Sequence, residues 1–383
     1  GELENVERNR DKSLGVTVYL GQKRGNASTS DFSPDAIRQT VQAAYDIARF
    51  TAEDPVAGLP DPEDVADEYP DLDLFHPWAI DSAEAARIAL ACEAAAFATS
   101  KKITNSEGAG VSAQQSHFWA GNSRGFRGGY ASSRHSLSVS PIAGRGNDMQ
   151  RDFWYTSERD ARDMAKPEAV GRYAAERALS RLKSRKIATC EVPVLFENTL
   201  AAGLLGSMVG ALSGGSLYRR ASFLLDHAGK QILPEWLTIQ EFPHLPGGLA
   251  STPFDGEGVR TRDMDIIRNG ELMSWLLTSY SARKLGLTTT GHAGGIHNWQ
   301  VSNTGQDFQG MLKEMGTGLL VTELMGQGVN IVNGDYSRGA AGFWVENGEI
   351  LYPVEEITIA GNLADMFSTL VAVGNDEDER SSL

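Results

Sequence analysis

The hydrophobic pattern is clearest in the last third of the chain, where short apolar and aromatic segments flank two dipeptides, Asn333-Gly334 and Asn347-Gly348. Asn-Gly favours a two-residue type I′ turn, because both central residues of that turn need a positive φ. The run from Thr322 to Val354 is therefore predicted to form two β-hairpins. The cross-strand pairs predicted at the second turn are Glu346–Glu349, Val345–Ile350, Trp344–Leu351 and Phe343–Tyr352. Strand alternation predicts an inward face made of Phe343, Val345, Ile350 and Tyr352.

Between these two turns, Gly339 to Gly342 carries almost no side-chain bulk. Such a backbone lets another group approach closely, and that group is either a neighbouring strand or an extended ligand. A third Asn-Gly turn, Asn269-Gly270, predicts a further hairpin in which Ile267 faces Leu272.

Helical patterns begin at recognisable capping residues. Ser33 and Asp81 are predicted N-caps, and Pro167 is predicted to open a third helix. A fourth helical segment, residues 200–215, reads LAAGLLGSMVGALSGG and is apolar on every side. It is too short to cross a membrane, so it is predicted to be a helix buried in a core.

Helices and strands occur in blocks rather than in βαβ alternation, which favours the α+β class over a doubly wound α/β fold. Residues 1–186 are predicted to form an N-terminal α+β domain with an antiparallel sheet and helices. Residues 187–383 are predicted to form a β-rich C-terminal domain around the buried apolar helix. Residues 52–74, rich in proline and acid, are predicted to be an exposed connection.

The composition narrows the possible partners. The chain of 383 residues has a net charge of −15, which argues against a long phosphate-binding surface and so against direct nucleic-acid binding. No apolar run reaches the length of a membrane span, so no membrane association is expected. Cys92 and Cys190 both lie in apolar surroundings and are expected to be buried free thiols, which favours the reducing cytoplasm.

Candidate chemistry is sparse. Among seven histidines, His292 and His297 form the one close pair, in a loop that contains two glycines. That pair is compatible with three roles: a metal site, polar groups lining a cleft, or support of the loop. Tyr336 and Arg338 lie beside the bulk-free segment and are candidates for lining the same cleft. Arg338 is suited to hold a carboxylate bidentately, but an Asp335–Arg338 pair that stabilises a turn is the favoured interpretation.

Glu197 is a weak candidate for a catalytic residue. It follows the strand VPVLF and precedes the apolar helix, a place where a metallohydrolase could hold ligands. Its neighbours do not fit, because Phe196 cannot bind a metal and the next turn offers Leu200 and Ala201. The residues alone therefore predict no metal site and no hydrolytic centre at this position.

Long segments of the chain resemble the TldD/PmbA family, specifically its PmbA (TldE) branch. The segments with the strongest resemblance are FLLDHAGKQILPEWLTI, GLASTPFDGEGVRT, WLLTSYSARKLGLTTTGHAGGIHNW, KEMGTGLLVTELMGQGVN and GDYSRGAAGFWVENGEILYPVEEITIAGNL. The resemblance covers essentially the whole chain. Family members usually extend further at both ends, so we expect further residues there in the complete protein.

The resemblance implies a subunit of a heteromeric TldD–PmbA metalloprotease that acts on unfolded or extended peptides, including peptide-antibiotic precursors and antitoxin-type substrates. The family name records an older proposed link to DNA gyrase. In the TldD branch an HExxxH helix binds zinc; here Phe196 and Ala201 stand in place of the two histidines. Glu197 stands where the catalytic glutamate would be. Zinc is therefore expected on the TldD-type partner, with no cofactor on this chain.

Two further hypotheses stay open. The chain could be a homo-oligomeric peptide-binding or regulatory module without a catalytic role, and a homodimer is possible when it is alone. It could also use a metal of its own at His292 and His297.

Overall fold

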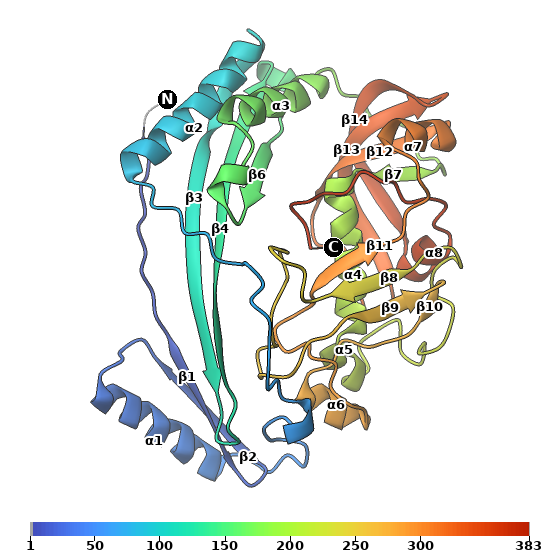
Figure 1. Cartoon of the computed structure of the whole chain (residues 1–383). Helices are drawn as coiled ribbons and strands as arrows, with labels where there is room; N and C mark the ends of the chain where they lie inside the picture. Colours follow the sequence, from blue (N-terminus) through green and yellow to red (C-terminus); the bar gives the residue numbers. More distant parts are fainter. Residues whose placement is uncertain (1–2, 383) are drawn as a thin grey trace.

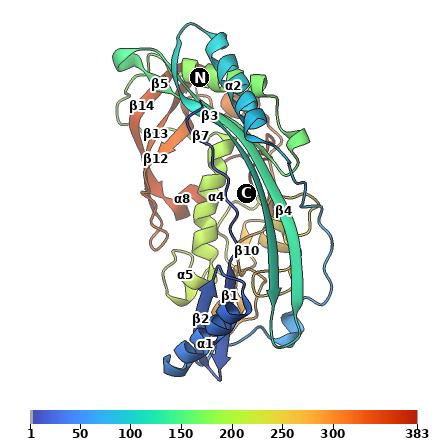
Figure 2. The same ribbon diagram turned by 90° about the vertical axis from the view of Figure 1, so that its left-hand side faces the viewer.

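The computed structural model describes residues 3–382 and has the α+β class that the sequence predicts. Figures 1 and 2 show a long β-ribbon with flanking helices on one side and a second, more compact part built from the C-terminal half of the chain. The helix α4 (Asn198–Leu212) lies between them in Figure 2.

The first elements form a small unit. The hairpin β1 (Leu14–Leu20) and β2 (Lys23–Thr29) carries the helix α1 (Pro34–Phe50) on one face. Ser33 is the N-cap, as predicted, and its side chain accepts a hydrogen bond from the Ala36 backbone N–H. The helix packs so closely on the hairpin that a Cβ at Gly25 would lie 2.0 Å from the Ala44 carbonyl oxygen.

The ribbon consists of two long antiparallel strands, β3 (Ile103–Gly121) and β4 (Arg127–Ala143). Two helices pack on one end of the ribbon (Figure 1), α2 (Ser82–Thr99) and α3 (Pro167–Ser180). Two short strands pair with β4: β5 (Gln150–Arg151) and β6 (Trp154–Glu158).

The C-terminal half contains two four-stranded sheets, in the orders β10-β9-β8-β11 and β14-β13-β12-β7. The strands of the first sheet are β8 (Ile239–Phe242), β9 (Met264–Arg268), β10 (Glu271–Leu272) and β11 (Asn298–Val301). The strands of the second sheet are β7 (Val194–Phe196), β12 (Gly318–Met325), β13 (Asp335–Glu346) and β14 (Glu349–Asn362). The remaining helices are α5 (Gly214–Tyr218), α6 (Ser279–Leu285), α7 (Phe308–Met315) and α8 (Leu363–Ser368).

The apolar helix α4 joins the largest hydrophobic core, which also receives side chains from both C-terminal sheets. Only four of its residues are buried: Leu204, Met208, Ala211 and Leu212. Its other side chains are partly exposed. Although α4 is apolar on every side, only one face of the helix is fully buried in the core. No helix of the described chain is long and apolar enough to cross a bilayer.

The turn at Asn347-Gly348 forms as predicted, with φ of 53° and 76° at its two residues. The pairs Glu346–Glu349 and Val345–Ile350 are confirmed. A bulge then shifts the register, so Trp344 pairs with Tyr352 and Phe343 pairs with Pro353. The predicted pairs Trp344–Leu351 and Phe343–Tyr352 are therefore wrong. The predicted inward face is only partly correct. Phe343 and Val345 pack in one hydrophobic cluster, but Tyr352 packs in another with Trp344, and Ile350 is 43% exposed.

The two other Asn-Gly dipeptides behave differently. Asn269-Gly270 turns the chain as predicted, and Ile267 pairs with Leu272. The predicted two-residue hairpin at Asn333-Gly334 is wrong, since the loop between β12 and β13 spans residues 326–334. The Asn333 side chain instead accepts a hydrogen bond from the Asp335 backbone N–H, a local bond that competes with a tight turn.

The bulk-free segment, Gly339 to Gly342, lies in β13 and pairs with β12 on one side and β14 on the other. A Cβ at Gly342 would lie 1.9 Å from the Leu320 carbonyl oxygen. Neighbouring strands therefore use the space that the missing side chains leave, and this segment has no free edge for a ligand strand.

The two cysteines differ in environment. Cys92 on α2 is fully buried, and burial raises the pKa of its thiol to about 12. Cys190 is exposed, contrary to the expectation that both thiols are buried. It lies in a segment without regular structure before β7.

We predict that Gly342→Ala destabilises the protein by about 1–3 kcal/mol, because the added methyl group overlaps the β12 backbone. Gly15→Ala is a matched control, since Gly15 also lies in a strand and its Cβ would meet no atom within 4 Å. We expect the control to change stability by less than about 0.5 kcal/mol in urea denaturation. Equal effects of the two substitutions would contradict the assignment of Gly342 to a close strand contact.

Candidate functional site

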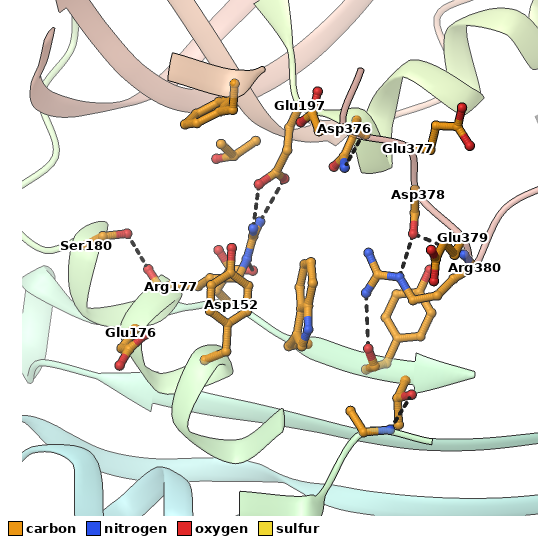
Figure 3. Close-up of a pocket in the computed structure, with 18 of the residues that line it drawn as sticks. Asp152, Glu176, Arg177, Ser180, Glu197, Asp376, Glu377, Asp378, Glu379 and Arg380 are labelled. Atoms are coloured by element: carbon orange, nitrogen blue, oxygen red, sulfur yellow. Dashed lines mark hydrogen bonds and ion pairs between the residues drawn. The ribbon is translucent and has the colours of Figure 1, made fainter. Parts of the chain in front are cut away.

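A cavity of about 790 Å³ lies between the N-terminal and C-terminal parts of the molecule. Aromatic side chains line both of its walls. Trp154, Tyr155 and Tyr173 come from β6 and α3, whereas Phe308 and Phe343 come from α7 and β13. Figure 3 shows that charged side chains gather between these walls, and that Asp376 to Arg380 close one side.

Glu197 lies in this cavity at the N-terminus of α4, where it is the N-cap residue. Its carboxylate does not cap the helix. Instead, Arg177 of α3 donates two hydrogen bonds to it, from Nη1 to Oε1 at 2.6 Å and from Nη2 to Oε2 at 3.1 Å (Figure 3). The Thr199 hydroxyl donates to Oε2 at 3.0 Å. This bidentate pair is the strongest geometry available to a carboxylate and a guanidinium.

The pair belongs to a larger network of buried charges. Asp152 accepts a hydrogen bond from Arg177 at 3.2 Å and lies 3.6 Å from Arg181, which also forms an ion pair with Glu323 on β12. Burial by itself lowers the pKa of Arg177, but hydrogen bonds and charge interactions with Glu197 and Asp152 raise it above the ordinary arginine value. The network therefore connects α3 to both α4 and β12 through permanently charged groups.

The segment that closes the cavity is held by aromatic and main-chain contacts. The Arg380 guanidinium lies 4.1 Å from the ring centre of Trp154 and 4.4 Å from that of Tyr155, a distance typical of cation–π contacts. Arg380 also donates to the Tyr155 carbonyl oxygen at 3.1 Å. Asn198, the first residue of α4, donates to the Asp376 carbonyl oxygen at 3.0 Å.

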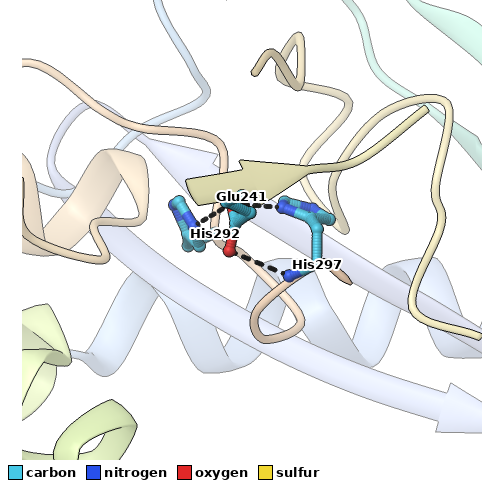
Figure 4. Close-up of side chains that lie close together, drawn as sticks. All are labelled: Glu241, His292 and His297. Carbon is cyan, nitrogen blue, oxygen red and sulfur yellow. Dashed lines mark hydrogen bonds and ion pairs between the residues drawn. The ribbon is translucent and has the colours of Figure 1, made fainter. Parts of the chain in front are cut away.

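A second cluster of polar groups lies in the C-terminal core, outside the cavity. His292 and His297 each lie 2.8 Å from the same carboxylate oxygen, Oε1 of Glu241 on β8 (Figure 4). All three residues are buried, and Glu241 has no exposed surface. Burial raises the pKa of Glu241, but the hydrogen bonds and charges of the two histidines lower it well below its usual range.

The structure thus brings His292 and His297 together, and it places both among the buried residues rather than in the lining of the cavity. Tyr336 and Arg338 also lie outside that lining. Tyr336 is buried in the core that contains α4, and burial raises the pKa of its phenol. The Tyr336 hydroxyl and Arg338 Nε are buried without a hydrogen-bond partner.

Three family models match the chain: the PmbA/TldA metallopeptidase domain 1 over residues 1–48, the central domain over 75–182 and the C-terminal domain over 189–383. Metalloprotease PmbA of Escherichia coli O157:H7 is 59% identical over 383 residues, which are 100% of this chain and 85% of that protein. The chain belongs to the PmbA/TldD metallopeptidase family. The Haemophilus influenzae homologue of metalloprotease PmbA is 52% identical over 100% of this chain and 85% of its own length, which supports the PmbA branch.

Solved structures of the PmbA/TldD family have the same fold. A proposed modulator of DNA gyrase from Bacteroides thetaiotaomicron aligns with a TM-score of 0.90 and 28% identity, over 97% of this chain and 85% of that one. TldE from Thermococcus kodakarensis aligns with a TM-score of 0.77 and 20% identity, over 94% of this chain and 88% of that one, and shows the fold alone. The predicted domain boundary at residue 186 stays a prediction.

The metal that the family name implies does not fit at the N-terminus of α4 in this chain. Phe196 and Ala201 have no ligand atoms in their side chains. The carboxylate of Glu197 is already held by three donors, two from Arg177 and one from Thr199. A general base needs a lone pair directed at water, and a metal needs several free ligands. We therefore derive no catalytic step from a metal at this position.

Several residues of the cavity are not found from the sequence. No sequence motif marks the charged residues Arg177, Asp152 and Arg380. The residues that they contact lie far from them along the chain. Arg177 and Arg181 lie four positions apart and so share one helix face, which is a weak signal. Glu241 is easier to recognise as unusual. It is a charged residue at a buried position of β8, whereas the preceding residue, Gln240, is exposed.

We predict that Arg177 and Glu197 are energetically coupled. A double-mutant cycle with Arg177→Met and Glu197→Gln is expected to give a coupling energy of about 2 kcal/mol, because each partner leaves a buried charge when the other is removed. The exposed pair of Glu84 and Arg87 on α2 is a matched control, for which Arg87→Met and Glu84→Gln should couple by less than about 0.5 kcal/mol. Urea denaturation of the four variants in each cycle measures this, and equal coupling in the two cycles would refute the prediction.

Proposed function

We propose that this chain is the subunit without catalytic zinc in a heteromeric peptidase, in which a TldD-type partner supplies the catalytic metal and this chain holds part of an extended peptide. The observation that carries the proposal is the state of Glu197. Glu197 stands at the start of α4, where the resemblance to the TldD branch implies a catalytic glutamate. Its carboxylate is nevertheless held by Arg177 and Thr199. Phe196 and Ala201, which stand in place of the metal-binding histidines, offer no ligand atoms. The cavity is thus built as a binding surface on this chain.

The shape and lining of the cavity support a peptide ligand. Its walls carry aromatic side chains from both parts of the molecule, which suits the burial of apolar side chains from a chain that lies between them. Ile350 and Phe343 supply part of the wall on the hairpin of β13 and β14.

The roles of individual residues follow from these contacts. Arg177 holds the two walls at a fixed separation through its ion pair with Glu197, and Asp152 supports Arg177. The aromatic groups exclude water from the bound segment and orient it. Peptide-antibiotic precursors and antitoxin-type proteins have the unfolded segments that this model requires. The two free cysteines favour a reducing compartment, and the cytoplasm stays the predicted location.

The alternative is a homo-oligomeric peptide-binding or regulatory module without a catalytic partner. One observation favours assembly of either kind, because α1 exposes apolar side chains: Val41 is 44% exposed, Tyr45 41% and Phe50 85%. Such a patch marks an interaction surface in many proteins. Whether its partner is a second copy of this chain or a TldD-type subunit decides between the two functions.

We predict that the purified chain alone does not cleave an unstructured fluorogenic peptide, because it lacks zinc ligands at α4. Addition of a TldD-type subunit is expected to give cleavage that a chelator abolishes and zinc restores. Size-exclusion chromatography of the mixture tests assembly separately from turnover. Chelator-sensitive cleavage by this chain alone would overturn the proposal, and failure of the two subunits to associate would favour the alternative.

We predict that Ile350→Glu raises the KM of the assembled enzyme for an apolar unstructured peptide by about tenfold, which corresponds to about 1.4 kcal/mol. The reason is that Ile350 lines the cavity and a charge there opposes burial of an apolar side chain. Leu351→Glu is the matched control, since Leu351 is 50% exposed and does not line the cavity. A similar rise in KM for both variants would contradict the assignment of the cavity as the peptide site.

A further inference from the structure

The buried cluster around Glu241 gathers three side chains that can act as metal ligands. Glu241 has no exposed surface, and its ion pairs in the described chain are with His292 and His297. A carboxylate in the protein interior is stabilised by hydrogen bonds, by a positive charge or by a metal ion. Imidazole nitrogens serve both as hydrogen-bond partners and as metal ligands, so the placement of these three side chains is the starting observation.

Thr290 holds the ring of His292 in place. The Thr290 hydroxyl accepts from the Leu277 backbone N–H at 2.7 Å, and it lies within hydrogen-bond distance of the Trp275 carbonyl oxygen, at 3.0 Å, and of His292 Nδ1, at 2.8 Å. The opposite ring nitrogen, Nε2, lies 2.8 Å from Glu241 Oε1. The contacts of Thr290 therefore keep Nε2 directed at the carboxylate.

The other contacts of Glu241 are made by its second oxygen, Oε2. Glu241 Oε2 is already satisfied, because it accepts from the His297 backbone N–H at 3.0 Å and from Trp299 Nε1 at 2.8 Å. Oε1 therefore faces His292 Nε2 and His297 Nδ1, and the three atoms lie within 4.8 Å of one another. Outer contacts of this kind, to the second nitrogen of a histidine and the second oxygen of a carboxylate, orient the ligands of metal sites.

The local backbone is shaped to bring the two histidines to one carboxylate. Gly294 and Gly295, between them, have φ of 122° and 128°, a region that side chains other than hydrogen rarely permit. Gly291 also has a positive φ, and a Cβ there would lie 2.8 Å from the Arg260 carbonyl oxygen. The loop is therefore constrained to its course rather than free to move, which is what a closed ligand set requires.

We propose that Glu241 Oε1, His292 Nε2 and His297 Nδ1 bind one divalent transition-metal ion of the zinc class, at a structural site that ties the loop before β11 to β8. Two imidazoles and one carboxylate are a ligand set that zinc accepts. None of the three residues lines the cavity, so this site is separate from peptide binding and from the zinc of a TldD-type partner. The proposal is independent of the proposed function.

Metal analysis of the full chain tests the proposal. The chain, prepared without a histidine tag, is stripped with dipicolinate and dialysed against zinc or cobalt. We expect about one metal ion per chain, a visible ligand-field spectrum for the cobalt form, and a zinc-dependent rise in Tm of about 5 °C. Glu241→Gln and His292→Gln should lose all three signals, because glutamine keeps a hydrogen-bonding group in the core while it binds metal poorly. His227→Gln is the control, since His227 Nδ1 contacts the Leu225 carbonyl oxygen and His227 is not one of the three grouped ligands.

The opposite result is equally clear. A folded wild-type chain that takes up less than about one tenth of an equivalent of either metal would overturn the proposal, and the cluster would then be a hydrogen-bonded support of the loop. Equal metal uptake by the wild type and Glu241→Gln would also overturn it, because the metal would be bound elsewhere. If the glutamine variants do not fold, the stoichiometry and cobalt spectrum of the wild type still decide, since a site of imidazole and carboxylate ligands gives a spectrum that adventitious hydrated cobalt does not.

Discussion

The buried ion pair between Arg177 and Glu197 determines both the shape and the chemistry of the cavity. Charges removed from water stabilise a fold only where the partner and the hydrogen bonds are complete, and here Asp152, Thr199 and Arg181 complete them. Because Arg177 belongs to α3 and Glu197 to the start of α4, the pair fixes the distance between the two walls. The same contact occupies the carboxylate that would otherwise be free to act as a base.

The C-terminal sheets provide the rigid frame for this pair. Glu197 follows β7 directly, and its backbone N–H donates to the Val321 carbonyl oxygen of β12 at 3.0 Å. β12 in turn packs against the bare backbone of Gly342, where even a methyl group has no space. The close packing of small residues in β13 therefore determines where α4 begins, and with it where the carboxylate meets Arg177.

Local signals were predictable from the sequence and long-range ones were not. Asn269-Gly270 and Asn347-Gly348 form turns because the preference for positive φ is a property of the dipeptide itself. Asn333-Gly334 fails because the Asn333 side chain bonds to the backbone of Asp335, and the bulge next to Val345 has no local signature. The approach of His292 to His297 follows from a short loop, whereas Glu241 reaches them only through the pairing of β8 with β11. The pairing of Arg177 with Glu197 could not be predicted for the same reason, since no pattern near Arg177 in the sequence points to Glu197.

The carboxylates of Glu197 and Glu241 differ in the groups that hold them. Glu197 is paired with a guanidinium, which keeps its proton at any physiological pH, so its charge balance is permanent and needs no further ion. Glu241 is held by two imidazoles, whose nitrogens serve as hydrogen-bond partners and as metal ligands. The residues around Glu197 therefore leave no place for a metal, whereas those around Glu241 are of the types that accept one. A carboxylate removed from water thus has a fixed support in one place and a proposed ligand site in the other.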